Sequence, residues 1–177
     1  AELRYVAEGE LDKVLTGTGG VIDFLIVDGD ANVFVDAKAV EMAYQGKVAY
    51  ALDVLKDRTK TSILKAIEQA HEVNRRLRSL DQSHPVVRSR DRNYLIVVTY
   101  KELYLGNGAT FCETIAKEKM DEIRDKYGDD VIPPENMYFL TVEELELFAE
   151  GIKTGKVGLV DALERAKEGD ARLETRK

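Results

Sequence analysis

Three ionisable residues interrupt two apolar stretches near the start of the chain. Asp23 lies within Val21–Val27, and Asp36 and Lys38 lie within Val33–Lys38. Both stretches are rich in Val, Ile and Phe, which is typical of β-strands. Because side chains alternate between the two faces of a strand, we expect Asp36 and Lys38 to point from the same face. Ionised groups inside apolar strands are costly unless they pair with an opposite charge or bind a metal, so these three residues are candidates for chemistry.

Two carboxylates and an amine on neighbouring strands are the residue types needed for metal-assisted hydrolysis of a phosphodiester. Carboxylate oxygens are the hard ligands that Mg²⁺ prefers, and the ion keeps several waters that a phosphate can displace. A bound ion polarises the phosphate and lowers the pKa of a coordinated water. A lysine beside it can orient or deprotonate that water, or stabilise negative charge in the transition state. The alternative interpretation is a structural ion pair between Lys38 and either Asp23 or Asp36 at a sheet end.

The elements that must position these residues follow from the apolar pattern. A polar turn, Asp28–Asn32, joins the two strands and predicts a β-hairpin. A helix is expected before it, over Glu2–Leu15, and the segment Ala39–Lys60 has broken helical spacing and should overhang the Lys38 end of the hairpin. In the rest of the chain, apolar periodicity predicts helices over Thr61–Leu80, Phe111–Tyr127 and Gly158–Lys167, and a further helix from a Thr141 capping box to about Glu150. Strands are expected over Asn93–Tyr100 and Met137–Leu140, and a loop over Asp81–Arg92. This order predicts an α/β fold in a single domain, residues 1–177.

Composition restricts the class of protein. The chain has 177 residues, of which 44% are hydrophobic and 33% are charged, as expected for one globular domain with its own core. No apolar run approaches the roughly 20 residues of a membrane span, and no signal peptide pattern occurs. We therefore expect no membrane partner. The single cysteine, Cys112, excludes an internal disulfide and fits a cytoplasmic location. The two histidines lie far apart, which argues against a structural zinc site, and His71 is expected at the surface.

Charge is distributed unevenly along the chain. The net charge is −7, whereas free-standing DNA-binding domains usually carry a basic excess. One basic segment runs from Arg75 to Arg92, with six arginines against two aspartates. Arginines in this arrangement can contact nucleic-acid phosphates, and a solvated charged loop is the alternative interpretation.

An aspartate on one strand, followed on the next by Asp-x-Lys, is the signature of the PD-(D/E)xK nuclease superfamily. The chain resembles that superfamily at Asp23 and at Asp36, Ala37 and Lys38. The resemblance implies that Asp23 and Asp36 hold Mg²⁺, with Mn²⁺ as a substitute, that the Ala37 carbonyl adds an oxygen ligand, and that Lys38 assists the attacking water. The chain departs from the pattern at Ile22, where the family has proline.

The C-terminal region narrows the resemblance. Tyr138–Leu145, then Gly151–Lys156 and a helix from Leu159, are similar to the end of the cleavage domain of FokI-type (type IIS) restriction endonucleases, and Asp36–Ala39 is similar to its Asp-Thr-Lys-Ala. The middle of the chain, Val40–Asp91, matches poorly. The resemblance implies a restriction-endonuclease-like mixed β-sheet core flanked by helices. It also implies non-specific DNA cleavage with a separate recognition domain, and a transient homodimer for double-strand cutting.

The superfamily resemblance adds further candidate residues. Many members take another metal ligand or orienting acid from the first helix, which makes Glu10 a candidate, with Glu8 and Glu2 as substitutes; a solvated helix face is the alternative for Glu10. Members also often place a glutamine that faces substrate at the position of Gln69. The predicted substrate-binding residues are therefore Gln69, Arg75, Arg76, Arg88 and Arg90.

The sequence thus predicts a Mg²⁺-dependent DNA endonuclease, the cleavage domain of a restriction-type enzyme. Because the chain begins at Ala1 without a methionine, we expect it to be a module of a longer protein with a DNA-recognition domain. Two alternatives stay open at this stage. One is a nuclease-fold binding or assembly module without turnover, and the other is a nuclease that acts on RNA or branched DNA.

Overall fold

The computed structural model describes residues 3–15, 19–39, 59, 62–103, 105–155 and 157–172. A mixed five-stranded sheet in the order β1-β2-β3-β4-β5 forms its centre. The strands are β1 (Arg4–Ala7), β2 (Phe24–Asp28), β3 (Ala31–Lys38), β4 (Arg92–Thr99) and β5 (Met137–Thr141). Pairing is antiparallel from β1 to β3 and parallel from β3 to β5. The predicted α/β class is therefore confirmed.

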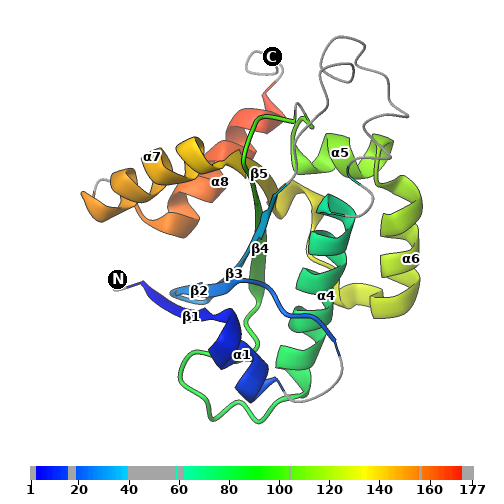
Figure 1. The fold of residues 1–177 in the computed structure, drawn as a ribbon, viewed down its shortest axis with the longest axis vertical. Coiled ribbons are helices and arrows are strands. Elements are labelled where there is room, and N and C mark those ends of the chain that lie inside the picture. Colours follow the sequence, from blue (N-terminus) through cyan, green and yellow to red (C-terminus); the bar gives the residue numbers. More distant parts are fainter. Residues whose placement is uncertain are drawn as a thin grey trace.

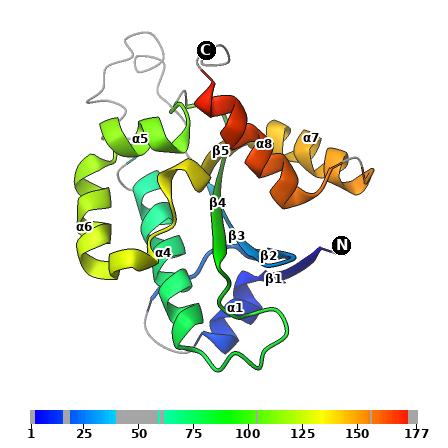
Figure 2. The same cartoon turned by 180° about the vertical axis from the view of Figure 1, so that it is seen from behind.

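Helices cover both faces of the sheet (Figure 1). On one face lie α1 (Glu8–Val14), α4 (Ile63–Ser79), α5 (Gly108–Thr114) and α6 (Lys117–Tyr127); on the other lie α7 (Val142–Lys153) and α8 (Leu159–Ala171). Viewed from behind, the α7–α8 pair stands apart from the other helices (Figure 2). Alternating strand residues fill the two cores: Phe34 packs with the α4 side, and Val33 and Val35 pack with α8.

The start of the chain differs from the expected single helix over Glu2–Leu15. Its first part is the strand β1, and only Glu8–Val14 is helical. The strand forms because Val6 pairs with Leu25 of β2 and is buried at 3% exposure. Tertiary pairing thus overrides a local pattern that is ambiguous over so few residues.

The predicted hairpin is confirmed, with a shorter first strand. Gly29 and Asp30 form the turn, and Gly29 has φ +60°, a backbone conformation that favours glycine. The first strand begins at Phe24 rather than at Val21, so Asp23 immediately precedes β2. Phe24 pairs with Val35, and one further step of this antiparallel register brings Asp23 opposite the residue after Val35.

The helix predicted over Thr61–Leu80 is confirmed as α4. Its apolar stripe is buried, but His71 is buried as well, which corrects the expectation of a surface histidine. The His71 Nδ1 lies 2.7 Å from the carbonyl oxygen of Ile67, and Nε2 accepts a hydrogen bond from the Ile132 N–H at 3.0 Å. This pairing requires the neutral ring with the proton on Nδ1. Burial lowers the pKa of His71 accordingly.

The strand predicted over Asn93–Tyr100 is confirmed as β4, but the helix predicted over Phe111–Tyr127 is two helices. The first, α5, begins earlier, at Gly108. A Cβ at Gly108 would lie 2.2 Å from the Pro134 carbonyl oxygen, so only glycine allows this close approach. The chain changes direction between α5 and α6 near Ala116 (Figure 1).

The C-terminal elements follow the prediction closely. The strand β5 and the capping box of Thr141 and Glu144 are both present. Helix α7 continues through Gly151 to Lys153, and α8 extends to Ala171, so both helices are longer than predicted. The expected elements in Ala39–Lys60 lie outside the described residues, apart from residues 39 and 59. Within the described part of the chain, no helix is long and apolar enough to cross a membrane.

Candidate functional site

The register of β2 and β3 brings the two predicted acids together. Phe24 pairs with Val35, so Asp23 and Asp36 lie opposite one another at the end of the hairpin. The Asp36 side chain is 3% exposed. Burial raises the pKa of the Asp36 carboxyl, the Lys38 ammonium opposes this shift, and the neighbouring Asp23 carboxylate adds to it. The two carboxyls therefore interact directly, as the sequence predicts.

Asp23 is held by the backbone of the Asp-x-Lys segment. Its Oδ2 accepts a hydrogen bond of 2.6 Å from the Ala37 N–H. Its own carbonyl oxygen accepts one of 2.8 Å from the Glu8 N–H, at the start of α1. These contacts fix the segment before β2 at the site, although Asp23 itself lies outside the strand. Ala37 is exposed, so its peptide lies at the surface of the site.

Lys38 bridges one acid and an amide. Its Nζ lies 2.6 Å from the Asp36 Oδ2 and donates to the Gln69 Oε1 at 3.2 Å. The Gln69 Nε2 in turn donates to the Val21 carbonyl at 3.2 Å. A Cβ at Gly20 would lie 2.4 Å from that Nε2, so the glycine leaves the space that the amide occupies. Asp36, Lys38 and Gln69 therefore form a chain of polar contacts that links β3 to α4.

The donor set fits a divalent ion with few protein ligands. The Asp36 Oδ2 is buried, and its partner is the Lys38 ammonium at 2.6 Å. An oxygen of this kind, beside the Asp23 carboxylate, is a suitable ligand for a hard cation. Among the described residues, no group of three or more His, Cys, Asp or Glu side chains could hold a metal ion. One or two carboxylates are nevertheless the usual protein share of a Mg²⁺ site.

Glu10 does not join this cluster. It lies in the first turn of α1 and is exposed, as is Glu8. Because no third acid completes a metal group within the described ranges, the structure gives Glu10 the solvated helix position that was the alternative interpretation. Glu2 lies outside the described residues.

The arginines of the predicted patch differ in burial and in their partners. Arg75 is exposed and pairs with Glu72 at 2.6 Å. Arg76 is buried and donates to the Leu15 carbonyl from Nη2. Arg90 is buried too, with Nη1 donating to the Asn32 Oδ1 at 2.8 Å. Two of these guanidinium groups therefore serve contacts inside the protein.

Arg88 and Arg90 also lie at the far end of the sheet. They precede Arg92, which pairs with Ala31 at the start of β3, whereas Lys38 pairs with Thr99 at its end. At roughly 3.3 Å per residue, these two ends of β4 are about 23 Å apart. The structure therefore brings Gln69 to the acids but does not bring Arg88 or Arg90 there.

One residue near the site was missed by the sequence reading. Lys65 is exposed and lies one helical turn before Gln69, on the same side of α4. The signal for it was the spacing of four residues from Gln69, but without the contact between Gln69 and Lys38 nothing distinguishes Lys65 from other surface lysines.

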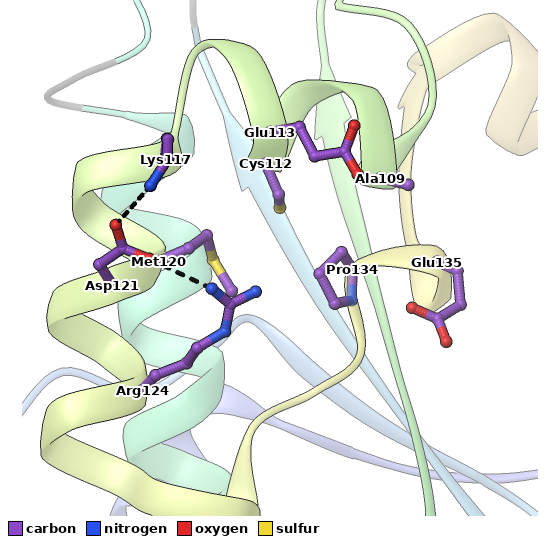
Figure 3. A pocket seen from close by; sticks show the side chains of 9 residues that line it. All are labelled: Ala109, Cys112, Glu113, Lys117, Met120, Asp121, Arg124, Pro134 and Glu135. Atoms are coloured by element: carbon purple, nitrogen blue, oxygen red, sulfur yellow. Dashed lines mark hydrogen bonds and ion pairs between the residues drawn. The ribbon is translucent and has the colours of Figure 1, made fainter.

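A separate hollow of about 380 Å³ lies between α5, α6 and the segment around Pro134 (Figure 3). Burial raises the pKa of the Cys112 thiol at its base to about 12, so this cysteine is not a nucleophile at neutral pH. Asp121 on its rim is neutralised by Lys117 at 2.9 Å and by Arg124 at 3.2 Å. None of the acids of the β2–β3 site lines this hollow.

Comparison of the chain with protein-family models, with curated proteins and with solved structures found no significant match.

Proposed function

We propose that this chain is a Mg²⁺-dependent DNA endonuclease domain of the PD-(D/E)xK type. The observation that carries the proposal is the pairing of Asp23 and Asp36 on adjacent chain segments, with the Lys38 ammonium 2.6 Å from the Asp36 Oδ2. A buried carboxylate beside a second carboxylate is unfavourable for a purely structural site, because each raises the free energy of ionising the other. Such an arrangement is typical of sites that bind a cation or carry out chemistry.

The order of the elements supports the same proposal. Three antiparallel strands, with α1 inserted between the first and the second, bring the acids together, α4 follows, and two strands in parallel pairing complete the sheet. This mixed sheet with flanking helices supports the proposal of a restriction-endonuclease-like core. The finer resemblance to the FokI-type cleavage domain has support from β5, the capped start of α7 at Thr141 and the closing helix α8.

Each residue of the site has a defined task in this reaction. Asp23 and Asp36 would hold Mg²⁺, or Mn²⁺ in its place, together with the carbonyl oxygen of Ala37. When bound, the ion polarises the phosphate and lowers the pKa of a coordinated water. Lys38 places a positive charge next to the attacked phosphate and orients the water, and Gln69 holds the Lys38 ammonium.

The distribution of charge supports a separate source of DNA affinity. The net charge is −7, and the arginines of the predicted patch are partly buried or paired with acids. Most arginines of this segment are therefore not available to bind the DNA backbone, which provides much of the affinity of DNA-binding proteins. A partner or a further domain for recognition, and transient pairing of two cleavage domains for double-strand cutting, form part of the proposal.

The test is nicking of supercoiled plasmid in Mg²⁺ and in Mn²⁺. Asp36→Asn should reduce nicking by at least about a hundredfold, because it removes charge that acts on the transition state. Asp91→Asn is the matched control, since Asp91 is exposed at the opposite end of β4 and should leave nicking unchanged. Metal-dependent nicking that persists in a folded Asp36→Asn protein would contradict the proposal. The same assay on single-stranded, branched and RNA substrates distinguishes the nuclease alternatives.

One observation favours a non-catalytic binding module as a second candidate. The described residues offer only the two acids at the site, and Lys38 already neutralises one of them. If calorimetry detects neither Mg²⁺ nor Mn²⁺ binding while DNA or protein binding is retained, this second function is supported.

A further inference from the structure

We propose that, in the metal-free protein, the Lys38 ammonium occupies the position beside Asp36 that a divalent cation would take. When the cation binds, Lys38 leaves Asp36 and is held by Gln69, which is therefore a positioning residue. This inference rests on the proposed function, because it concerns the same acids. It predicts that Lys38 competes with the cation for the carboxylates, and that Gln69, on α4, determines how strong this competition is.

The contact between Lys38 and Asp36 carries the first step. The Nζ lies 2.6 Å from the Asp36 Oδ2, which is buried. A cation that uses this oxygen must therefore replace the ammonium. Because the Asp36 side chain is 3% exposed, water solvates the carboxylate poorly, and a cation at this position stabilises its ionised form.

The net charge of the site before and after cation binding indicates where Lys38 must lie. With the ammonium alone, Asp23, Asp36 and Lys38 carry a net charge of about −1, which repels a phosphate. With a divalent cation on the carboxylates and Lys38 still nearby, the net charge is about +1, which attracts a phosphate. Lys38 must therefore leave Asp36 without leaving the site.

Gln69 provides the second position for Lys38. Its Oε1 already accepts from the Lys38 Nζ at 3.2 Å, while its Nε2 is held by the Val21 carbonyl at 3.2 Å. The Val21 contact turns the amide oxygen towards Lys38. A neutral acceptor holds the ammonium without competing with the cation for charge. The space for this amide exists because residue 20 is a glycine.

Mn²⁺ affinity, measured by electron paramagnetic resonance in the absence of DNA, tests the inference without an activity readout. Lys38→Met keeps the length of the side chain but removes the charge, and should tighten Mn²⁺ binding by about fivefold. Lys153→Met, at the exposed end of α7, removes the same charge far from the site and should leave the affinity unchanged. Unchanged or weaker Mn²⁺ binding by Lys38→Met would overturn the competition.

A double-mutant cycle separates positioning from a structural role. Gln69→Leu should weaken Mn²⁺ binding by about threefold in the native background, because Lys38 then has no second acceptor, and should have no effect in the Lys38→Met background. An equal effect in both backgrounds would overturn the role of Gln69. Gly20→Ala, which displaces the same amide, should reproduce Gln69→Leu and is the second variant if Gln69→Leu does not fold. If no protein binds Mn²⁺ the proposed function fails, whereas equal binding by all variants overturns only this inference.

Discussion

The sharpest prediction concerns Asp36→Asn, which should stabilise the metal-free protein. Burial and the neighbouring Asp23 raise the pKa of the Asp36 carboxyl, so its ionised form is less favourable in the folded than in the unfolded chain. Asparagine has nearly the same shape without the charge. Its amide can also donate to the Asp23 carboxylate, a charge-assisted hydrogen bond. These gains oppose the loss of the ion pair with Lys38, which keeps its contact with Gln69.

The expected size follows from the environment of the pair. Replacing a whole buried ion pair with neutral groups is often neutral or stabilising by about 1–4 kcal/mol, whereas removing one partner is destabilising when the remaining charge is buried. Lys38 is 18% exposed and keeps its contact with Gln69, so its charge stays partly solvated and we expect a small net gain, at most about 1 kcal/mol. For a chain of this length that corresponds to a rise in Tm of about 2–4 °C.

The pH dependence provides an independent check of the sign. A carboxyl with a raised pKa in the folded state binds more protons there than in the unfolded state. The native protein therefore loses stability as pH rises from the ordinary aspartate pKa through the raised pKa of Asp36. The advantage of Asp36→Asn should be largest near pH 7 and should shrink as the pH falls.

Thermal unfolding with and without Mn²⁺ completes the assay. At a Mn²⁺ concentration tenfold above its Kd, binding should stabilise the native protein by about 1.4 kcal/mol and the variant much less. Asp121→Asn is the matched control: its carboxylate is half-exposed and salt-bridged, so its loss should destabilise only slightly. A metal-free Asp36→Asn protein less stable than the native one by about 1 kcal/mol would refute the reasoning and identify a structural ion pair.

Three further predictions follow from other parts of the fold. Burial lowers the pKa of His71, so the free energy of unfolding should fall as pH drops below about 6.5, where the unfolded chain gains a proton; urea unfolding at pH 7.5 and pH 5.5 measures this. Gly108→Ala should destabilise by about 3 kcal/mol in urea unfolding, because its Cβ would lie 2.2 Å from the Pro134 carbonyl oxygen. Lys65→Ala should weaken DNA binding and reduce the slope of log affinity against log salt by about 1, because Lys65 lies one turn from Gln69.

Each of these predictions has a matched control. His71→Gln should remove most of the difference between the two pH values, whereas His84→Gln, at a half-exposed site, should not. Gly151→Ala on α7 meets open space and should stabilise by about 0.5–1 kcal/mol. Arg88→Ala, at the other end of the sheet, should leave the salt slope unchanged. Equal effects of Lys65→Ala and Arg88→Ala on DNA binding would contradict the placement of the phosphate contact.

Local sequence signals determined much of the fold. The hairpin, α4, β4, β5 and the Thr141 capping box were all predictable, because turn residues, apolar periodicity and caps act over a few neighbouring residues. The Asp36 and Lys38 pair was predictable for the same reason, since residues two apart on a strand share a face. The candidate acids could therefore be named from the sequence.

Only the tertiary structure decided how those residues are used. The strand β1 exists because β2 provides a partner, and His71 is buried because the Ile132 N–H lies against its ring. The register of two strands brings Asp23 to Asp36, and the packing of α4 brings Gln69 to Lys38, across 31 positions of sequence. Such contacts depend on the relative placement of whole elements, which is set by the shared core rather than by the residues next to each side chain.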